Sequence, residues 1–385
     1  MNTELVKGFR DITGIEADKR AFILEIIRRT FVKYNFEQIE TPIIEYEEFV
    51  KGENPNDEVI SDIFRLRDKG DRKLALRYEF TFQLKRVAKN KKLPYKRFQI
   101  GPVFRDEPVS ANRLRQFTQC DIDVIGSDIK SEAEVLAITR EILDALKIKS
   151  KIYINNRKML NEILDELKIK EKEAVLREID KLDKLPEKEV EQNLKKYDAE
   201  KVLGILKNGE DFFKKYKSFE EIEELKKYCR YYGFDVIFVP YLVRGLSYYN
   251  QNVFEIKSDL RESICAGGSY LVNGIQSTGI SLGVERLEAI TKIAVRYDKV
   301  LVVSLNEDKK AIEVAKKLQK NGKFVTIFYG KPSKALEYAN AYKIRNVIFV
   351  GAKELKQKKF KIKDMETGTT KVLVIKKRVA KKDGS

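Results

Sequence analysis

The first part of the chain shows one amphipathic helix followed by segments that alternate apolar and polar side chains. Apolar residues recur at helical spacing over 18–35, which predicts the helix. The next segment, 36–45, alternates with a period of two and contains Pro42, so we expect a strand at an edge or interface. Further strands are expected at 73–81, 96–105 and 116–126. These segments predict an antiparallel sheet with hairpin connections.

The pattern changes over 157–230, where the sequence is charged, helical in spacing and nearly free of glycine and proline. This change predicts a helical subdomain inserted into the sheet. Strand patterns return at 235–246, 246–256 and 264–272. The segment 277–293 then runs from a glycine-bearing strand into a helix.

From residue 297 onward, continuous apolar strands alternate with helices, which predicts a small parallel sheet covered by helices on both faces. We therefore divide the chain into an α+β domain over 1–296 and a smaller α/β domain over 297–385. Residues 351–385 contain 12 basic and 4 acidic side chains. A solvated tail would explain this charge, but we favour an RNA-contacting surface.

Composition narrows the possible partners and compartments. The net charge of +17 favours a polyanionic partner such as nucleic acid, although 36% charged residues also suits a heat-adapted surface. No segment has the roughly 18 apolar residues of a membrane helix, and the N-terminus lacks an apolar signal region. The three cysteines are scattered, which indicates a reducing cytoplasm and argues against a disulfide framework or a zinc site.

The chain contains no histidine. This absence excludes Ser-His-Asp triads, H-E-x-x-H metalloproteases and histidine-ligated metal sites. Any catalysis must use Arg, Lys, Asp, Glu, Tyr, the backbone or a hydrated ion. Phosphoryl and nucleotidyl transfer suit such a set, because they depend mainly on positioning and charge neutralisation.

Two segments carry arginines that could bind phosphates. Arg105 and Arg113 lie at the two ends of a polar loop between expected strands, and guanidinium groups match phosphate oxygens. Phe117 offers a flat face to a base. In the segment 277–293, Gly279 and Gly283 allow close backbone approach, and Arg286 opens the helix. Each segment also has a simpler explanation. The first would be a surface hairpin with ordinary ion pairs, and the second a common strand-to-helix junction.

A third segment places Arg244 shortly before the paired tyrosines Tyr248 and Tyr249. Because side chains alternate along a strand, we expect one tyrosine to face a site and the other to face away, unless a bulge intervenes. Core aromatics are the simpler alternative.

Together these segments resemble one family. FRDE at 104–107 is similar to motif 2 of class II aminoacyl-tRNA synthetases, GVER at 283–286 to motif 3, and Pro42 to motif 1, the dimer element. RGLSYY at 244–249 and CAGGSY at 265–270 resemble the histidyl-tRNA synthetases, as do the opening KGFRDI and FTQCDIDVIG. The resemblance spans almost the whole chain. It implies a class II catalytic fold with a helical insertion and a C-terminal anticodon-binding domain.

The resemblance also implies a histidine pocket. Glu79, Thr81 and Gln119 would hold the α-ammonium group, while Asp123 and Tyr249 would read the two nitrogens of the imidazole. The complete implied histidine-binding set is Glu79, Phe80, Thr81, Arg105, Gln119, Asp123, Arg244, Tyr248, Tyr249 and Tyr270.

For ATP, the implied set is Arg105, Glu107, Arg113, Phe117 and Arg286. Arg105 and Arg244 would flank the α-phosphate and stabilise the transition state, so these two are the expected catalytic residues. The histidine carboxylate would attack the α-phosphorus, and the adenylate would then pass to the terminal ribose of tRNA-His. The implied partners are L-histidine, ATP with Mg²⁺ and a second copy of the chain in a cytoplasmic homodimer, with no tightly bound cofactor or protein-bound metal.

The sequence departs from the family pattern at three positions. Ser247 replaces an aspartate, a change expected to loosen Arg244; Ser269 replaces an arginine, and Asn112 a loop glycine. Two other functions stay open: a non-catalytic paralogue that regulates histidine biosynthesis, and another class II synthetase such as a prolyl or threonyl enzyme. The RGLSYY segment argues against the second. The C-terminal α/β domain, which the regulators typically lack, argues against the first.

Overall fold

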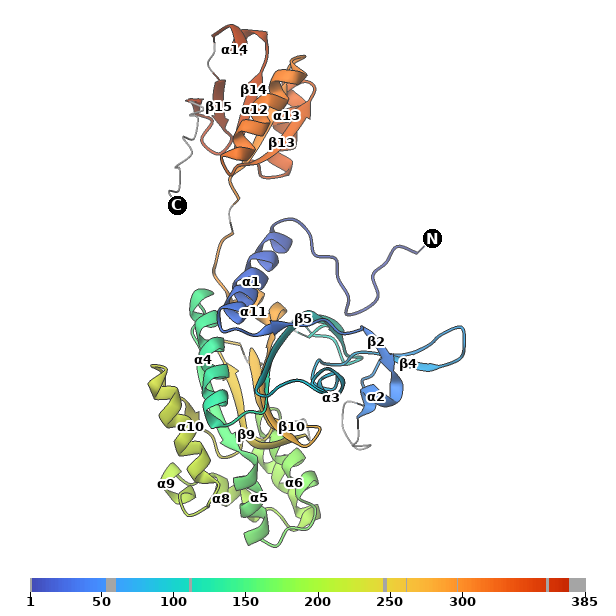
Figure 1. Ribbon diagram of the computed structural model, residues 1–385, viewed down its shortest axis with the longest axis vertical. Helices are drawn as coiled ribbons and strands as arrows, with labels where there is room; N and C mark the ends of the chain where they lie inside the picture. The colour runs from blue at the N-terminus through green and yellow to red at the C-terminus, as the bar shows by residue number, and fades with distance from the viewer. Residues whose placement is uncertain are drawn as a thin grey trace. The chain divides into compact units, whose positions relative to one another are not determined.

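The computed structural model describes residues 2–52, 60–110, 113–244, 248–260, 262–295, 297–357 and 360–373. The chain forms two compact units, Met1–Ala294 and Val295–Ser385 (Figure 1). The first unit is built on a sheet whose strands are β1 (Glu37–Gln38), β5 (Tyr95–Phe104), β6 (Gln116–Ile125), β7 (Lys151–Asn156), β8 (Ile237–Phe238), β9 (Tyr249–Lys257), β10 (Cys265–Val272) and β11 (Ile275–Gly283).

The order of these eight strands is β1-β5-β6-β11-β10-β9-β7-β8. The six central strands pair antiparallel, as the alternating pattern predicts. Within the described part of this sheet, only the short edge strands β1 and β8 pair parallel to their neighbours. The central strands therefore form an antiparallel platform, and its residues face either helices or a cavity.

Three predicted strands are shorter than expected. The segment 36–45 is not one strand: β1 ends before Pro42, and β2 (Ile44–Tyr46) begins after it, because proline cannot donate to a ladder. The prediction for 73–81 is correct only for β4 (Lys73–Leu76), which pairs with β2 and β3 (Arg65–Arg67) in a separate three-stranded sheet.

The third shortened strand is 235–246, where β8 is the only part of the described residues 235–244 that forms a ladder. Pro240 interrupts the segment, and the side-chain amide of Asn155 donates instead to the carbonyl oxygens of Pro240 and Leu242, at 2.8 and 2.9 Å. The chain leading to Arg244 is thus an ordered loop held by one buried side chain.

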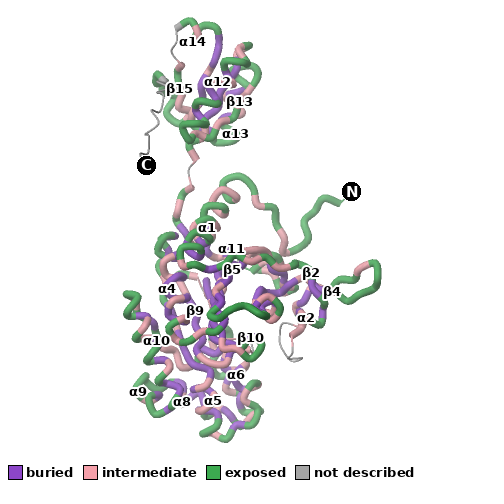
Figure 2. The backbone as a smooth tube through the Cα atoms, viewed as in Figure 1, coloured by how far each residue is buried: buried purple, intermediate pink, exposed green. Residues whose placement is uncertain are grey.

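Helices cover one face of the large sheet. They are α1 (Gly14–Lys33), α4 (Ile129–Ala145) and α11 (Val284–Ile290), while α2 (Glu47–Lys51) and α3 (Leu84–Val87) flank the smaller sheet and the loop after it. Asp128 caps α4 by accepting from the Ser131 backbone at 2.9 Å. Ile23 and Phe31 of α1 pack with Ile122 of β6 in the main apolar core. Buried residues run along the strands and α4 (Figure 2).

The predicted helical insertion lies between β7 and β8. Asn156 starts it by accepting from the backbone of Lys158 at 2.8 Å. Its helices are α5 (Arg157–Glu166), α6 (Lys172–Ile179), the 3-10 turn η2 (Asp180–Asp183), α7 (Glu187–Leu194), the 3-10 turn η3 (Lys195–Tyr197), α8 (Lys201–Leu206), α9 (Glu210–Phe213) and α10 (Phe219–Tyr231).

The second unit contains β12 (Lys299–Ser304), α12 (Asp308–Lys320), β13 (Phe324–Tyr329), α13 (Pro332–Ala341), β14 (Asn346–Val350), α14 (Ala352–Gln357), β15 (Phe360–Asp364) and β16 (Thr370–Leu373). Helices cover both faces, as predicted: Val300 and Val302 pack against α12, whereas Leu301 and Val303 pack against α13. The sheet is mixed rather than parallel, because the closing hairpin adds β15 and β16 antiparallel. Residues 358–359 and 374–385 of the basic segment 351–385 lie outside the described residues.

None of the helices in the described ranges is both long and apolar enough to cross a membrane.

Candidate functional site

The alternation of β6 separates the core from a polar cavity. Cys120, Ile122 and Val124 belong to the apolar core, whereas Asp121 and Asp123 line the cavity on the other face. Across the sheet, Asp121 lies opposite Ser281 of β11, and Asp123 lies opposite Gly279. The strand pattern predicted from the sequence therefore places a row of acidic side chains in one site.

The cavity has a volume of about 680 Å³. It brings together nearly all the residues that the sequence motifs singled out. The predicted residues that line it are Glu79, Thr81, Arg105, Glu107, Arg113, Phe117, Gln119, Asp123, Arg244, Tyr248, Tyr249, Tyr270 and Arg286. Phe80 is the exception: it is fully buried away from the cavity, and the Arg77 guanidinium stacks 4.8 Å from its ring.

Carboxylates cluster at one end of this cavity. Burial, with the nearby Asp121 adding to the effect, raises the pKa of Glu79 to about 7. Burial likewise raises the pKa of Asp121 to about 6, with Asp123 adding to the effect. Oε1 of Glu79 is buried and has no hydrogen-bond partner in the part of the chain that the structure describes. A cationic group of a ligand would relieve this concentration of negative charge.

Asp123 is held from two sides. Its Oδ2 lies 2.6 Å from Nη2 of Arg97, a fully buried guanidinium, and its Oδ1 accepts from the Tyr270 hydroxyl. Burial raises the pKa of Asp123, while Arg97 and Tyr270 act in the opposite direction. A Cβ atom on Gly279 would collide with this carboxylate, so the glycine is required for the position of Asp123.

Three tyrosines form the adjoining wall. The ring of Tyr248 lies 4.8 Å from Tyr249 and 5.4 Å from Tyr270. Both members of the 248–249 pair line the cavity, because the register between β9 and β10 shifts between Gly268 and Tyr270. The Tyr248 hydroxyl donates to Oε2 of Glu79 at 3.1 Å. The phenol bonded to Asp123 is that of Tyr270, although Tyr249 lines the same cavity.

Arginines cluster at the other end. Arg105 follows β5 directly, and its guanidinium donates to Oε1 of Gln119 at 3.2 Å. Its carbon Cζ lies 4.3 Å from the ring of Tyr78 and 5.1 Å from that of Phe117. Arg113 reaches across the loop to Glu107, with Nε 3.0 Å from Oε2. These contacts leave both guanidiniums beside the cavity in fixed orientations.

Arg286 lies in the first turn of α11 (Val284–Ile290) and donates to the carbonyl oxygen of Ser263 at 2.5 Å. Burial is the main cause that lowers the pKa of its guanidinium. Repulsion by other guanidiniums lowers it further, and these belong to Arg105, Arg113 and Arg244. Four arginines are thus close enough to repel one another, which makes this end of the cavity a site for a polyanion.

Arg244 adopts a left-handed backbone conformation with φ of 71°, which is uncommon for a residue other than glycine. Its Nη1 lies 2.8 Å from Oε1 of Glu255 on β9. Burial lowers the pKa of Arg244, but Glu255 together with Tyr249, Asp180 and Tyr248 more than offsets this effect, and the pKa is raised. Glu255 thus supplies a carboxylate that orients the arginine, while Ser247, like Asn112, lies outside the described residues.

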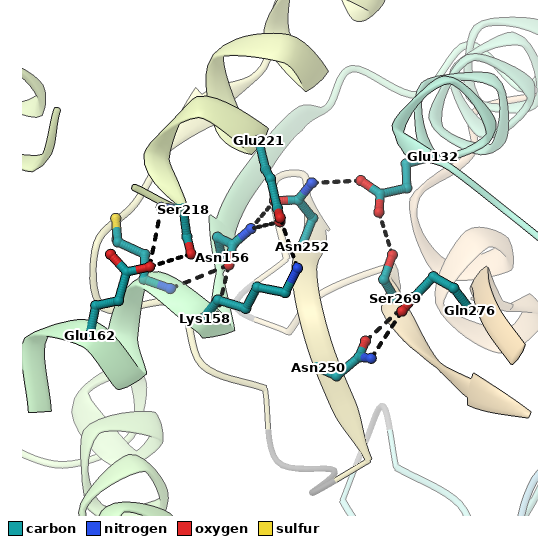
Figure 3. A network of polar contacts seen from close by, with 11 residues as sticks. Glu132, Asn156, Lys158, Glu162, Ser218, Glu221, Asn250, Asn252, Ser269 and Gln276 are labelled. Carbon is teal, nitrogen blue, oxygen red and sulfur yellow. Dashed lines mark hydrogen bonds and ion pairs between the residues drawn. The ribbon is translucent and has the colours of Figure 1, made fainter. Parts of the chain in front are cut away.

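The third departure, Ser269, lies on the opposite face of β10 and does not line the cavity. Its hydroxyl donates to the buried Glu132 of α4, which also accepts from the Asn252 amide at 2.7 Å (Figure 3). Asn252 in turn accepts from Asn156 at 2.9 Å, at the start of the helical insertion. Ser269 therefore belongs to a polar network that joins the sheet to its covering helices.

Several cavity residues were not predicted from the sequence. Asp121 shares the two-residue period of Gln119 and Asp123, so the signal was present. Tyr78, Ser281 and Glu255 also lie on strands or loops next to predicted residues. By contrast, no local signal indicates that Asp180, Asp183 and Lys184 of the insertion reach the same cavity.

The arrangement suits a ligand with a cationic end and a polyanionic end, held in one orientation. An amino acid and a nucleoside triphosphate placed together have this charge distribution. In the described ranges, no group of three or more Cys, Asp and Glu residues is placed to hold a metal ion.

Comparison with known proteins identifies the family of this chain. Residues 8–287 match the family model "Histidyl-tRNA synthetase", and residues 299–382 match "Anticodon binding domain". The chain is 33% identical to a histidine–tRNA ligase of Wolinella succinogenes, covering 95% of this chain and 94% of that protein. It is 31% identical to histidine–tRNA ligase 2 of Shouchella clausii, covering 94% and 96%.

Among solved structures, histidyl-tRNA synthetase from Nostoc sp. PCC 7120 superimposes with a TM-score of 0.82 at 26% identity, covering 97% of both chains. A Bacillus halodurans protein described as an ATP phosphoribosyltransferase regulatory subunit/histidyl-tRNA synthetase superimposes with a TM-score of 0.77 at 21% identity. The superposition covers 91% of this chain and 98% of the Bacillus halodurans chain. At 21% identity, this likeness shows the fold alone.

Proposed function

Because this chain belongs to the histidyl-tRNA synthetase family, we propose that it is a histidine–tRNA ligase. It activates L-histidine with ATP to form histidyl-adenylate, and then transfers the histidyl group to the 3′ end of tRNA-His. The observation that carries this proposal is the single cavity with clustered carboxylates at one end and four arginines at the other.

At the carboxylate end, Glu79, Thr81 and Gln119 hold the α-ammonium group of histidine. The free, buried Oε1 of Glu79 supports this role, because the free protein offers it no donor among the described residues. Asp123 and Tyr249 contact the imidazole nitrogens. Tyr248 and Tyr270 complete the wall around the ring, whereas Phe80 supports the pocket from behind.

At the other end, Arg105 and Arg244 flank the α-phosphate and Arg286 binds the γ-phosphate. Glu107 and Phe117 hold the adenine, and Arg113 contacts the phosphates or the tRNA acceptor end. An oxygen of the histidine carboxylate attacks the α-phosphorus, and the bond to the bridging oxygen of pyrophosphate breaks. The two flanking guanidiniums stabilise the added charge, so no protein nucleophile is required. Mg²⁺ enters as part of the ATP substrate, bound to its phosphates.

The adenylate is then attacked by the terminal ribose hydroxyl of tRNA-His, which releases AMP. The second unit matches the anticodon-binding domain, and it is the part of the chain we expect to contact the anticodon. We also expect a homodimer. Exposed apolar side chains on and beside the three-stranded sheet support this expectation: Ile43, Ile44, Tyr46 and Leu66. Cytoplasmic location stays a prediction, supported by the three free buried cysteines.

The test is ATP–pyrophosphate exchange with each of the twenty amino acids in turn. We expect exchange with histidine alone, followed by charging of tRNA-His. Exchange with a different amino acid would show another synthetase specificity. Absence of exchange with every amino acid would overturn the proposal and favour the regulatory paralogue, a role named for the Bacillus halodurans structural neighbour.

A further inference from the structure

A chain of alternating charges links the helical insertion to Arg244. Lys257, the last residue of β9, places its Nζ 2.7 Å from Oδ2 of Asp183 in η2 and 3.2 Å from Oε2 of Glu255. The other oxygen of Glu255 lies 2.8 Å from Nη1 of Arg244. The order is therefore Asp183, Lys257, Glu255 and Arg244, with opposite charges at every step.

Glu255 is the buried centre of this chain. Its side chain is 7% exposed, against 25% for Arg244, 30% for Lys257 and 47% for Asp183. A buried carboxylate requires compensation by cations and donors, and the Ser263 hydroxyl also donates to the oxygen that meets Arg244. Because the two oxygens of Glu255 serve two different cations, removing Lys257 would leave one oxygen uncompensated and free the carboxylate to turn.

The backbone around Arg244 gives this side chain little support of its own. The residue follows a loop rather than a strand and has φ of 71°. Its Nε is buried without a hydrogen-bond partner among the described residues. The contact with Glu255 therefore fixes the direction of the guanidinium.

At this point the insertion and the end of β9 are joined by the ion pair between Asp183 and Lys257. A second cavity of about 170 Å³ lies between η2, the loop before Arg244 and the end of β9. Asp183, Glu255 and Lys257 line both this cavity and the larger one. Asp180 of the same 3-10 turn adds to the negative field that acts on Arg244.

We propose that Asp183 and Lys257 are positioning residues, through which the helical insertion holds the Glu255–Arg244 pair in the geometry needed for adenylate formation. The inference rests on the proposed histidine activation. It assigns the insertion a part in the chemical step, separate from any contact with tRNA. Neither residue touches the reacting atoms; both act through Glu255.

The test compares wild-type protein with Lys257→Met, Lys257→Arg, Asp183→Asn and the Asp183→Asn/Lys257→Met double variant in histidine-dependent ATP–pyrophosphate exchange. Lys257→Met should lower kcat about tenfold with KM for histidine changed less than about twofold, because the arginine acts mainly on the transition state. Lys257→Arg should restore at least about half of kcat, because it keeps the cation. The two single effects should not multiply in the double variant, because both break one chain.

A matched control lies elsewhere in the insertion. Lys207 Nζ and Glu187 Oε1 form a 2.5 Å ion pair whose residues do not line the cavity. Lys207→Met and Glu187→Gln should leave kcat within about twofold of wild type, because an exposed pair contributes little. An equal loss of kcat in the control variants would overturn the inference, as would an unchanged kcat in Lys257→Met or no recovery in Lys257→Arg.

Amide hydrogen exchange tests the ionic link by a measurement that does not depend on catalytic activity. Lys257→Met, but not Lys257→Arg, should speed exchange at residues 180–183 and 241–244 in the free protein. If wild-type protein fails to activate histidine, the proposed function is wrong. The role in adenylate formation then fails with it, and amide hydrogen exchange tests the ionic link alone: faster exchange in Lys257→Met supports the link, and unchanged exchange removes it.

Discussion

The two ends of the cavity differ in how the protein compensates their charge. At the carboxylate end, Asp123 has a buried cation of its own in Arg97, but the raised pKa values of Glu79 and Asp121 show that these two acids lack enough compensation. At the arginine end, Arg244 is paired with Glu255 and Arg113 with Glu107, but burial, and then repulsion by the other arginines, lowers the pKa of Arg286. At each end, some charged side chains are paired within the protein, and others lack full compensation until a ligand of opposite charge binds.

Under the proposed function, this difference explains how one cavity orients two substrates. The paired groups fix the geometry, because an ion pair holds a side chain in one direction. The unpaired groups supply the binding energy, because a ligand of opposite charge restores their compensation. A ligand bound in reverse would bring phosphates to the acids and an ammonium group to the arginines.

The arginine end should be the more sensitive to substitution. Arg244→Gln should lower kcat of histidine-dependent exchange by about 10²–10³-fold, because a preorganised charge beside the reacting phosphate is lost. Steady-state kinetics of ATP–pyrophosphate exchange measure this change. As a control, Arg345→Gln removes an arginine that pairs with Asp364 at 2.9 Å in the second unit. It should leave exchange unchanged, and similar kcat values for the two variants would contradict the role of Arg244.

The carboxylate end should respond through affinity. Gly279→Ala should raise KM for histidine about 10–100-fold and KM for ATP much less, because the new methyl group displaces Asp123 from Arg97 and Tyr270. Kinetics with each substrate varied separately distinguish the two constants. Gly204→Ala is the matched control, since its methyl group would meet nothing within 4 Å in α8. Equal changes in both KM values would argue against a localised acidic end.

The smallest expected effect is a pH dependence caused by Glu79. Its pKa is about 7 in the free protein, and an ammonium group binds only the ionised carboxylate strongly. Histidine affinity should therefore rise by roughly threefold to tenfold as the pH increases from 6 to 8, after correction for the titration of histidine itself. Isothermal titration calorimetry in buffers of different ionisation enthalpy measures both affinity and proton release.

Glu132 provides the control for that measurement. Burial also raises its pKa to about 7, but it lies in the network of Figure 3 and not in the cavity. Glu132→Gln should keep the pH dependence of binding, and Glu79→Gln should remove it. The assignment of Glu79 to the ammonium group fails if Glu79→Gln binds histidine with the same pH profile as wild type.

Local patterns predicted much of this molecule. The alternation of β6 placed Gln119 and Asp123 on one face, and short motifs marked the arginines and tyrosines that line the cavity. The fold class followed from the change between two-residue and helical periods. These features depend on neighbours in sequence, so the sequence alone contains them.

Other features depend on contacts between distant segments. The small sheet separates from the large one because β4 pairs with β2 and β3, and no periodicity indicates that choice. Phe80 lies between two predicted pocket residues but points into the core. The approach of Asp183 to Lys257 joins an inserted helix to a strand 74 positions away. Such pairings require the folded chain, because they are selected by packing and charge compensation.

The register between β6 and β11 determines which side chains face the cavity, so an intact site requires correct pairing of these two strands. Asp121 faces Ser281 and Asp123 faces Gly279 across this pair. A slip by a single residue would turn both aspartates toward α4 and present Cys120 and Ile122 to the solvent-filled side. Such a misfolded chain would lose apolar burial and substrate recognition at once, so a nearly native but inactive form with these strands out of step would be too unstable to accumulate.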